Sequence, residues 1–249
     1  MNNLVQYIYG IADNALILGQ RLGELCGHGP NLETDIAMTN IALDLFGQTR
    51  SYYQYAAKQL GGDATEDTIA FLRNEREYKN VLLVEQPNID FAYSIVRQFL
   101  FDEFHLLLLN GLQHSKDDTL AAIAKKSIKE VAYHKRFSSD WIKRLGDGTD
   151  ESRKRVQNAI DDLWTFTDEL FHLTDTDSAM VGEGIGVDVK QLKGIFIDNV
   201  KKILDEATLE IPEMKYFQKG GKNGVHTEHM GYLLADMQFM QRTYPNMNW

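Results

Sequence analysis

The segment from Lys129 to His134 comes closest in this chain to a metal-binding motif. Di-iron carboxylate proteins take a Glu from each of two helices and a Glu-x-x-His pair from each of two others. One helical turn then aims a carboxylate and an imidazole at the same metal. Here Tyr133 stands three residues after Glu130, and the imidazole comes one position later, at His134. The segment is therefore either an altered metal site or the remnant of one.

Carboxylates interrupt apolar runs at three further places. Asp44 lies in IALDLF, Asp13 lies in YIYGIADNALIL, and Asp102 precedes His105 by three residues in FLFDEFHLLLL. Isolated buried carboxylates are rare unless they are paired or bound to a metal. From this pattern alone, a metal site remains open beside buried ion pairs and hydrogen-bonded networks.

Long segments without a helix breaker must position these residues. The chain of 249 residues has only four prolines, and breaks containing glycine fall at 27–30, 61–63, 146–148 and 182–186. We expect helices at about 3–26, 31–60, 64–80, 87–114, 117–145, 151–172, 188–208 and 224–243. Long helices joined by short turns are antiparallel neighbours. The sequence therefore predicts an all-α helical bundle and a single domain over residues 1–249.

Composition and charge exclude several classes of function. The net charge of −10 argues against a surface for nucleic acid or an anionic membrane, since both require clustered Lys and Arg. A single cysteine, Cys26, cannot form an intramolecular disulfide and fits a reducing compartment. The N-terminus lacks a signal-peptide pattern, and apolar runs such as 106–109 are too short to span a bilayer. We therefore expect a cytoplasmic protein.

Ordered blocks along the chain carry a family resemblance. They are QRLGELCGHGP, ETDIAMTNIALDLFGQTR, REYKNVLLVEQPNIDFAYSIVRQFLFDEFH, IKEVAYHKRFSSDWIKRLGDGTDES, LWTFTDELF and GVHTEHMGYLLADMQFMQR. Together, from Tyr7 to Trp249, they resemble the C-subunit family of the phenylacetyl-CoA 1,2-epoxidase, a ring-oxygenating multicomponent monooxygenase. The resemblance implies a ferritin-like bundle with additional C-terminal helices. It also implies a non-catalytic structural subunit in aerobic phenylacetate catabolism.

The same resemblance implies partners and cofactors. A catalytic A subunit, a paralogue on the same fold, would carry the di-iron centre and bind the CoA thioester. A small B subunit and a reductase would complete the complex, and the reductase would pass electrons from NADPH through a flavin and an iron–sulfur cluster. This chain would hold no cofactor of its own. When isolated, it could form a homodimer through the face that meets the paralogue.

Set against the di-iron template, the chain retains the order of the ligands but not their types. The vestigial positions are Asp13, Asp44, Gly47, Asp102, His105, Glu130, Tyr133 and His134. Gly47 and Tyr133 stand where the template has histidine, and three of the four Glu are shortened to Asp. We therefore expect no metal ligand and no catalytic residue. The expected alternative is a buried hydrogen-bond network of Asp44, Asp102, Glu130, Tyr133 and His134.

The C-terminal sequence HTEH offers a second possible metal motif. His226 and His229 are spaced to chelate a metal from one helix face, but two histidines without further ligands are a weak signal. Thr227 can cap a helix that has Glu228 and His229 in its first turn. We favour a structural or interface role for His226, Glu228 and His229.

Two further segments could lie near a substrate. RNEREYKN, at 73–80, is predicted to be mostly a solvated helical face, from which Tyr78, Lys79 and Asn80 could reach the CoA thioester or the catalytic subunit. The glycine-rich segment 175–188 is long enough to be a binding loop, with Ser178, Ala179 and Met180 toward a ligand or partner. An exposed connector explains it equally well.

Two other functions stay open at this point. The chain could be an active di-iron oxygenase or oxidase with an unusual ligand set, which would be Asp102, His105, Glu130 and His134. It could also be a freestanding helical binding protein without an oxygenase partner.

Overall fold

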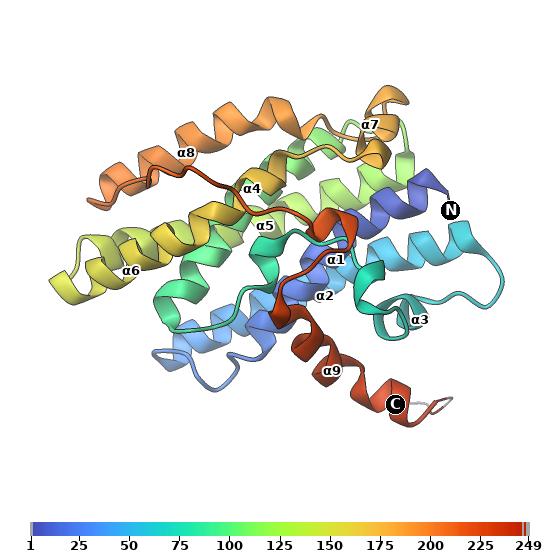
Figure 1. Cartoon of the computed structure of the whole chain (residues 1–249), viewed down its shortest axis with the longest axis horizontal. Coiled ribbons are helices and arrows are strands. Elements are labelled where there is room, and N and C mark those ends of the chain that lie inside the picture. Colours follow the sequence, from blue (N-terminus) through green and yellow to red (C-terminus); the bar gives the residue numbers. More distant parts are fainter. Residues whose placement is uncertain (1, 246, 248–249) are drawn as a thin grey trace.

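The computed structural model describes residues 2–245 and 247 (Figure 1). Its α-helices are α1 (Asn3–Gly23), α2 (Leu32–Leu60), α3 (Glu66–Phe71), α4 (Phe91–Leu112), α5 (Asp118–Gly146), α6 (Asp150–Leu163), α7 (Asp175–Gly182), α8 (Lys193–Glu206) and α9 (Glu228–Thr243). Short 3-10 turns lie between them, and no strand occurs in these described ranges. The predicted all-α class is therefore confirmed.

Two antiparallel hairpins, α1–α2 and α4–α5, make a ferritin-like four-helix bundle (Figure 1). The side chains of Asn31, Asp90 and Asp117 begin α2, α4 and α5 by accepting backbone N–H groups of the first turn. Gly61, with φ of 68°, ends α2 in a conformation that glycine adopts without strain. The connection 61–90 then crosses between the hairpins, and one long crossover is typical of ferritin-like bundles.

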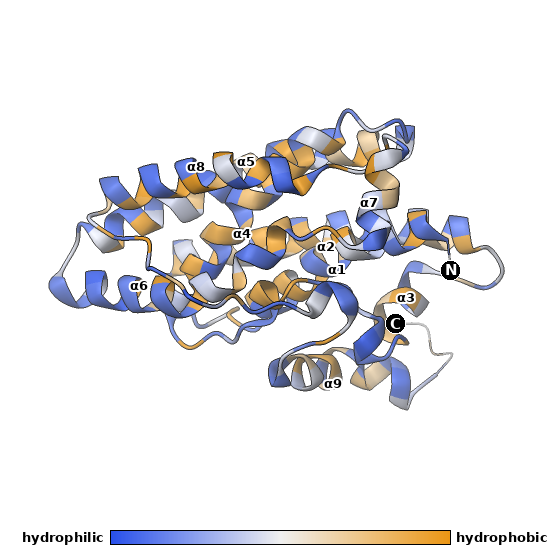
Figure 2. Ribbon diagram, turned by 45° about the horizontal axis from the view of Figure 1, so that its top comes forward, coloured by the Kyte–Doolittle hydropathy of each residue, from blue (hydrophilic) through white to orange (hydrophobic). Residues whose placement is uncertain are grey.

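The core is one contiguous cluster of buried hydrophobic residues to which every α-helix of the described chain contributes. Helices α1 and α4 are buried on most sides, which fits their apolar composition. The α4 ribbon is mostly hydrophobic and α6 mostly hydrophilic in Figure 2. Helices α6 and α8 cover α4 and α5, α7 packs on α1, and α9 contacts α3 at the edge of the molecule. No helix in the described ranges is long and apolar enough to cross a membrane.

Three segments differ from the predicted elements. The helix predicted over 64–80 ends at Phe71, and the predicted helix 151–172 becomes 3-10 turns after Leu163. Part of the predicted loop 175–188 is helix α7, because Thr174 and Asp177 form a reciprocal capping box at its start. In the crossover, side chains of the bundle helices bind the backbone in place of helical hydrogen bonds. The N–H of Lys79, for example, donates to the carboxylate of Asp13 in α1.

Candidate functional site

The positions matched to the di-iron template do not converge on one point. Gly47 is exposed, and the side chain of Tyr133 also faces outward, with 40% of Tyr133 exposed. Asp13 is fully buried, but it is bound to a different part of the chain. Across residues 2–245 and 247, no group of three or more His, Cys, Asp or Glu side chains is arranged to hold a metal. The residues present therefore do not fit a di-iron centre.

Two polar bridges join α2 to α5 where the template would place metal ligands. His134 Nε2 lies 3.0 Å from Asp44 Oδ2, and Gln48 Nε2 donates to Glu130 Oε2 at 3.1 Å. The His134 side chain is fully buried, whereas that of Asp44 is 38% exposed. Burial lowers the pKa of His134, although the hydrogen bond and charge of Asp44 oppose the shift. Burial also raises the pKa of Glu130. These bridges connect the two hairpins.

Asp102 belongs to a separate polar group, in the interface between α4 and α5. It is fully buried and accepts hydrogen bonds from Gln98 Nε2 at 2.7 Å and Ser138 Oγ at 2.8 Å. Burial raises the pKa of Asp102 well above its usual range, although these bonds oppose the shift. Burial, reinforced by the charge of His134, lowers the pKa of His105 to about 3. Both groups are thereby favoured in their uncharged forms.

The predicted buried network is wrong in its inclusion of Tyr133. The Tyr133 ring lies beside Phe137 and His134, with the Arg136 guanidinium 5.7 Å from its centroid. Its exposure excludes it from the interior. The remaining residues form separate pairs rather than one network, because Asp102 bonds to neither Asp44 nor Glu130.

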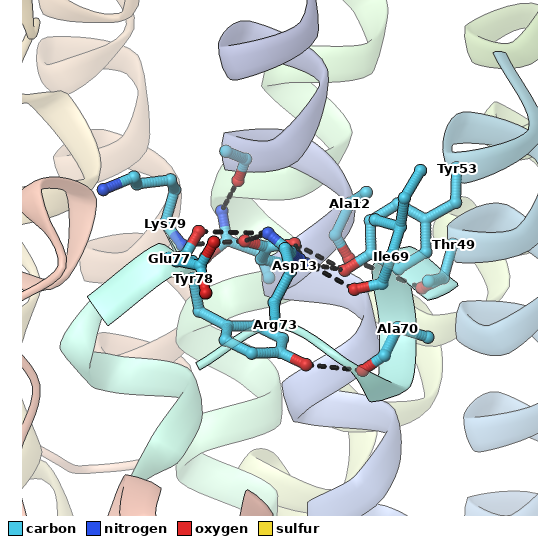
Figure 3. Close-up of polar contacts among 12 residues, drawn as sticks. Ala12, Asp13, Thr49, Tyr53, Ile69, Ala70, Arg73, Glu77, Tyr78 and Lys79 are labelled. Atoms are coloured by element: carbon cyan, nitrogen blue, oxygen red, sulfur yellow. Dashed lines mark hydrogen bonds and ion pairs between the residues drawn. The ribbon is translucent and has the colours of Figure 1, made fainter. Parts of the chain in front are cut away.

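Asp13 forms the densest polar cluster that the structure describes, shown in Figure 3. Its carboxylate accepts Arg73 Nη1 at 3.0 Å and Nη2 at 2.6 Å, the Tyr53 hydroxyl, and the Lys79 backbone N–H at 2.7 Å. The guanidinium of Arg73 also lies 4.2 Å from the ring centroid of Tyr78. Burial would lower the pKa of Arg73, but the charge and hydrogen bond of Asp13, together with Tyr53 and Tyr78, outweigh it and raise this pKa. Sequence reasoning missed Arg73, because no local pattern marks it as the partner of Asp13.

The prediction that 73–80 is mostly a solvated face holds for residues 74–77, which are exposed, but is wrong for most of the rest of the segment. Tyr78 and Asn80 are fully buried, and Arg73 is 8% exposed. Asn80 Nδ2 donates to the Glu85 carboxylate at 3.1 Å, and the Tyr78 hydroxyl donates to a backbone carbonyl. Tyr78 and Asn80 are thus enclosed in the interior of this chain, away from any substrate at its surface, while Lys79 remains available.

His226 pairs with Glu85 rather than with His229. Its Nδ1 lies 2.9 Å from Glu85 Oε2, and its Nε2 lies 3.1 Å from the Tyr78 carbonyl oxygen. Both ring nitrogens thus face acceptors, which only the protonated imidazole satisfies at once. Burial lowers the pKa of His226, but Glu85, together with the Tyr78 carbonyl and the charge of Glu75, more than offsets this and the net shift is upward. Glu228 and His229 lie in the first turn of α9.

A cavity of about 300 Å³ lies beside Lys79. Its wall includes Tyr7 and Asn14 of α1, Phe104 of α4, and Lys222 from the segment before α9. Thr174 to Asp177, at the start of α7, close another side. The two segments predicted to lie near a substrate therefore meet at one place.

Only some of the residues predicted to lie near a substrate line this cavity. Lys79 lines the cavity, but Ser178 is exposed and Met180 is buried in the core at 2% exposure. Ala179 is half-buried and also lies outside the lining. These three residues lie off the cavity because α7 is a helix, which turns its first residues toward the cavity and the next ones away.

Comparison with known proteins gives two matches over the whole chain. The family described as "Phenylacetic acid catabolic protein" matches residues 1–249. The C subunit of the 1,2-phenylacetyl-CoA epoxidase of Escherichia coli (strain K12) is 49% identical over 249 residues, which are 100% of both chains.

Proposed function

This chain belongs to the phenylacetic acid catabolic protein family, and from that premise we propose that it is a subunit of a phenylacetyl-CoA epoxidase complex. Its role in that complex is structural: it supports a catalytic subunit and does not itself oxidise the substrate. The full-length similarity to the C subunit of the Escherichia coli epoxidase supports membership of the complex.

The contacts made by the residues at the template positions support the structural role. The template positions of this chain already serve other purposes, since Asp13 is bound to Arg73 and Asp44 to His134. Gly47 and Tyr133 face outward, where they could not complete a metal site between the helices. The polar groups that remain connect helices.

The partners follow from the same proposal. A catalytic paralogue would hold the di-iron centre and the CoA thioester, with a small B subunit beside it. A reductase would supply electrons from NADPH through its flavin and iron–sulfur cluster. We place the assembly in the cytoplasm, where the free thiol of the exposed Cys26 would remain reduced.

Co-expression with a catalytic paralogue tests the proposal. The two chains should co-purify and epoxidise phenylacetyl-CoA, and the iron should remain with the paralogue when the chains are separated. Failure to bind any catalytic paralogue would favour the freestanding binding protein. About two irons retained per chain of this subunit would favour the active di-iron enzyme.

A variant pair separates a structural from a catalytic role. His134→Ala should lower the yield of assembled complex, because it removes a partly buried bridge between α2 and α5. Turnover per assembled complex should stay unchanged. Glu130→Gln keeps the shape of a half-buried side chain while removing a carboxylate, and it too should leave this turnover unchanged. Loss of turnover with assembly intact would show that these residues act in the chemistry.

A further inference from the structure

The cavity beside Lys79 has walls that are fixed before any ligand arrives. The backbone N–H of Lys79 is held by Asp13 at 2.7 Å. Asn14 accepts the Val81 N–H at 2.8 Å, which holds the crossover against α1. The hydroxyl of Tyr7 accepts a backbone N–H from the segment after α7 at 3.1 Å. Preformed walls reduce the ordering cost of binding a small molecule.

Lys79 brings a positive charge to this cavity, which the carboxylates of Asp175 and Asp177 also line. Figure 3 shows its side chain pointing away from Asp13, although its backbone is bound there. The ammonium donates to the Arg76 carbonyl at 3.3 Å and forms no ion pair with any residue that the structure describes. It lies against the turn before α9, since a Cβ on Gly224 would come within 3.2 Å of Nζ.

Lys222, two residues before that glycine, adds a second ammonium. Its side chain is 13% exposed, and Nζ donates to the His172 carbonyl at 2.8 Å. Asp177 is a weak partner, because its Oδ2 is 3.8 Å away and already accepts the Thr174 N–H of the helix cap. Burial lowers the pKa of Lys222, although Asp177 and Glu169 oppose the shift, so an anion in the cavity would further stabilise its charged form.

The rest of the lining is suited to an apolar body. Ile11, Phe104 and Leu108 are 6%, 2% and 6% exposed, and all three face the cavity. Asp175 and Asn223 are exposed, so the cavity reaches the surface at that side. Its volume of about 300 Å³ is at the lower limit for small-molecule sites. A bare inorganic anion would leave the apolar part unfilled.

From these features we propose that the cavity between α1, α4 and α7 binds a small organic carboxylate with an aromatic or short aliphatic body. The carboxylate lies between Lys79 and Lys222, and the body contacts Phe104 and Leu108. The inference goes beyond the proposed function and does not depend on it, because the site is built from this chain alone.

Calorimetric titration of the full chain with phenylacetate tests the charge recognition. Saturable binding is expected, and Lys79→Met should weaken it about tenfold or more, as for loss of a hydrogen bond to a charged group. Lys58→Met removes an exposed lysine at the end of α2 and should leave the affinity unchanged. Phenylacetamide and inorganic phosphate should each bind at least tenfold more weakly than phenylacetate.

Gly10 allows a test that keeps both lysines. It lines the cavity from α1, and a Cβ there meets no atom within 4 Å. Gly10→Phe should fill the cavity and abolish binding, while Gly10→Ala should retain it, and thermal unfolding of both variants would verify that they fold. Absence of saturable binding by the unaltered chain would overturn the proposal. Binding that survives both Gly10→Phe and Lys79→Met would place the ligand elsewhere and overturn it as well.

Discussion

Replacing Asp13 by Asn isolates the contribution of the buried ion pair to stability. The change retains size and one acceptor oxygen, but it replaces the other oxygen with an NH₂ group. That group would face donors, since the Arg73 guanidinium, the Tyr53 hydroxyl and the Lys79 N–H all point at the carboxylate. Arg73, which is 8% exposed, would then be a buried cation without its counter-charge.

The magnitude follows from these contacts. Breaking a buried pair by removing one partner costs about 3–5 kcal/mol. The rings of Tyr9 and Tyr78, whose centroids lie 4.3 and 4.2 Å from the Arg73 guanidinium carbon, stay in place. Desolvated cation–π contacts contribute about 2 kcal/mol, so part of the stabilisation of the cation survives. We therefore expect a loss at the lower end, about 3 kcal/mol, or about 6–12 °C in Tm for a chain of this length.

Urea unfolding of the unaltered chain and of Asp13→Asn measures this loss as a lower midpoint at an unchanged slope. Asp205→Asn is the matched control: Asp205 pairs with Lys201 at 3.1 Å, with side chains 60% and 62% exposed. That variant should change stability by less than about 0.5 kcal/mol. A loss below about 1 kcal/mol for Asp13→Asn would mean that water reaches the pair, which would refute its assignment as a desolvated ion pair.

Four further substitutions have expected outcomes. Because the pKa of His226 is raised above its ordinary value of 6.5, its stabilising contribution is complete below pH 6.5 and is lost as the pH rises through the folded-state pKa. Over that range, the free energy of unfolding measured by urea titration should fall by at most about 1.4 kcal/mol per pH unit. His226→Gln should remove this pH dependence. The pKa of His134 is lowered from 6.5, so its contribution to stability is present above pH 6.5 and is lost as the pH falls below it. His134→Gln should therefore reduce the loss of unfolding free energy below pH 6.5. Gly146→Ala would place a Cβ 2.3 Å from the backbone oxygen of Ala207 and should lower the free energy of unfolding by about 1–3 kcal/mol. At Gly47 a Cβ would meet no atom within 4 Å, so Gly47→Ala should stabilise α2 by about 0.5–1 kcal/mol. Equal shifts of Tm for the two variants would contradict this difference in packing.

The sequence predicted the long helices well because local chemistry sets their limits. Helix α2 was expected at 31–60 and spans Leu32–Leu60, and α5 was expected at 117–145 and spans Asp118–Gly146. Asn31 and Asp117 provide N-terminal caps that can be recognised from residue type alone. The crossover could not be predicted in this way. Its backbone is held by the carboxylates and amides of other segments, and no periodicity records such contacts.

The candidate site was predicted in part, for a related reason. Asp13 was correctly expected to be buried, since it interrupts an apolar run, but Arg73 is distant in sequence and its neighbours are charged. Tyr133 was placed inside because the metal template requires a ligand there. The helical period of α5 indicated otherwise: Ser127, Val131 and His134 mark the buried face, and Tyr133 is not on it.

The Asp13–Arg73 pair also explains how the chain keeps a defined arrangement of its hairpins. Asp13 binds the Lys79 N–H and so fixes the crossover and the wall of the cavity. The carbonyl of Arg73 accepts Gln238 Nε2 at 2.9 Å and Arg242 Nη2 at 2.8 Å, which places α9 on the same cluster. Through its pair with Arg73, this buried carboxylate thus links the first hairpin and the crossover to the C-terminal helix. Such a carboxylate has a structural reason to persist without any metal, so its presence in a metal-template position is not by itself a sign of oxidation chemistry.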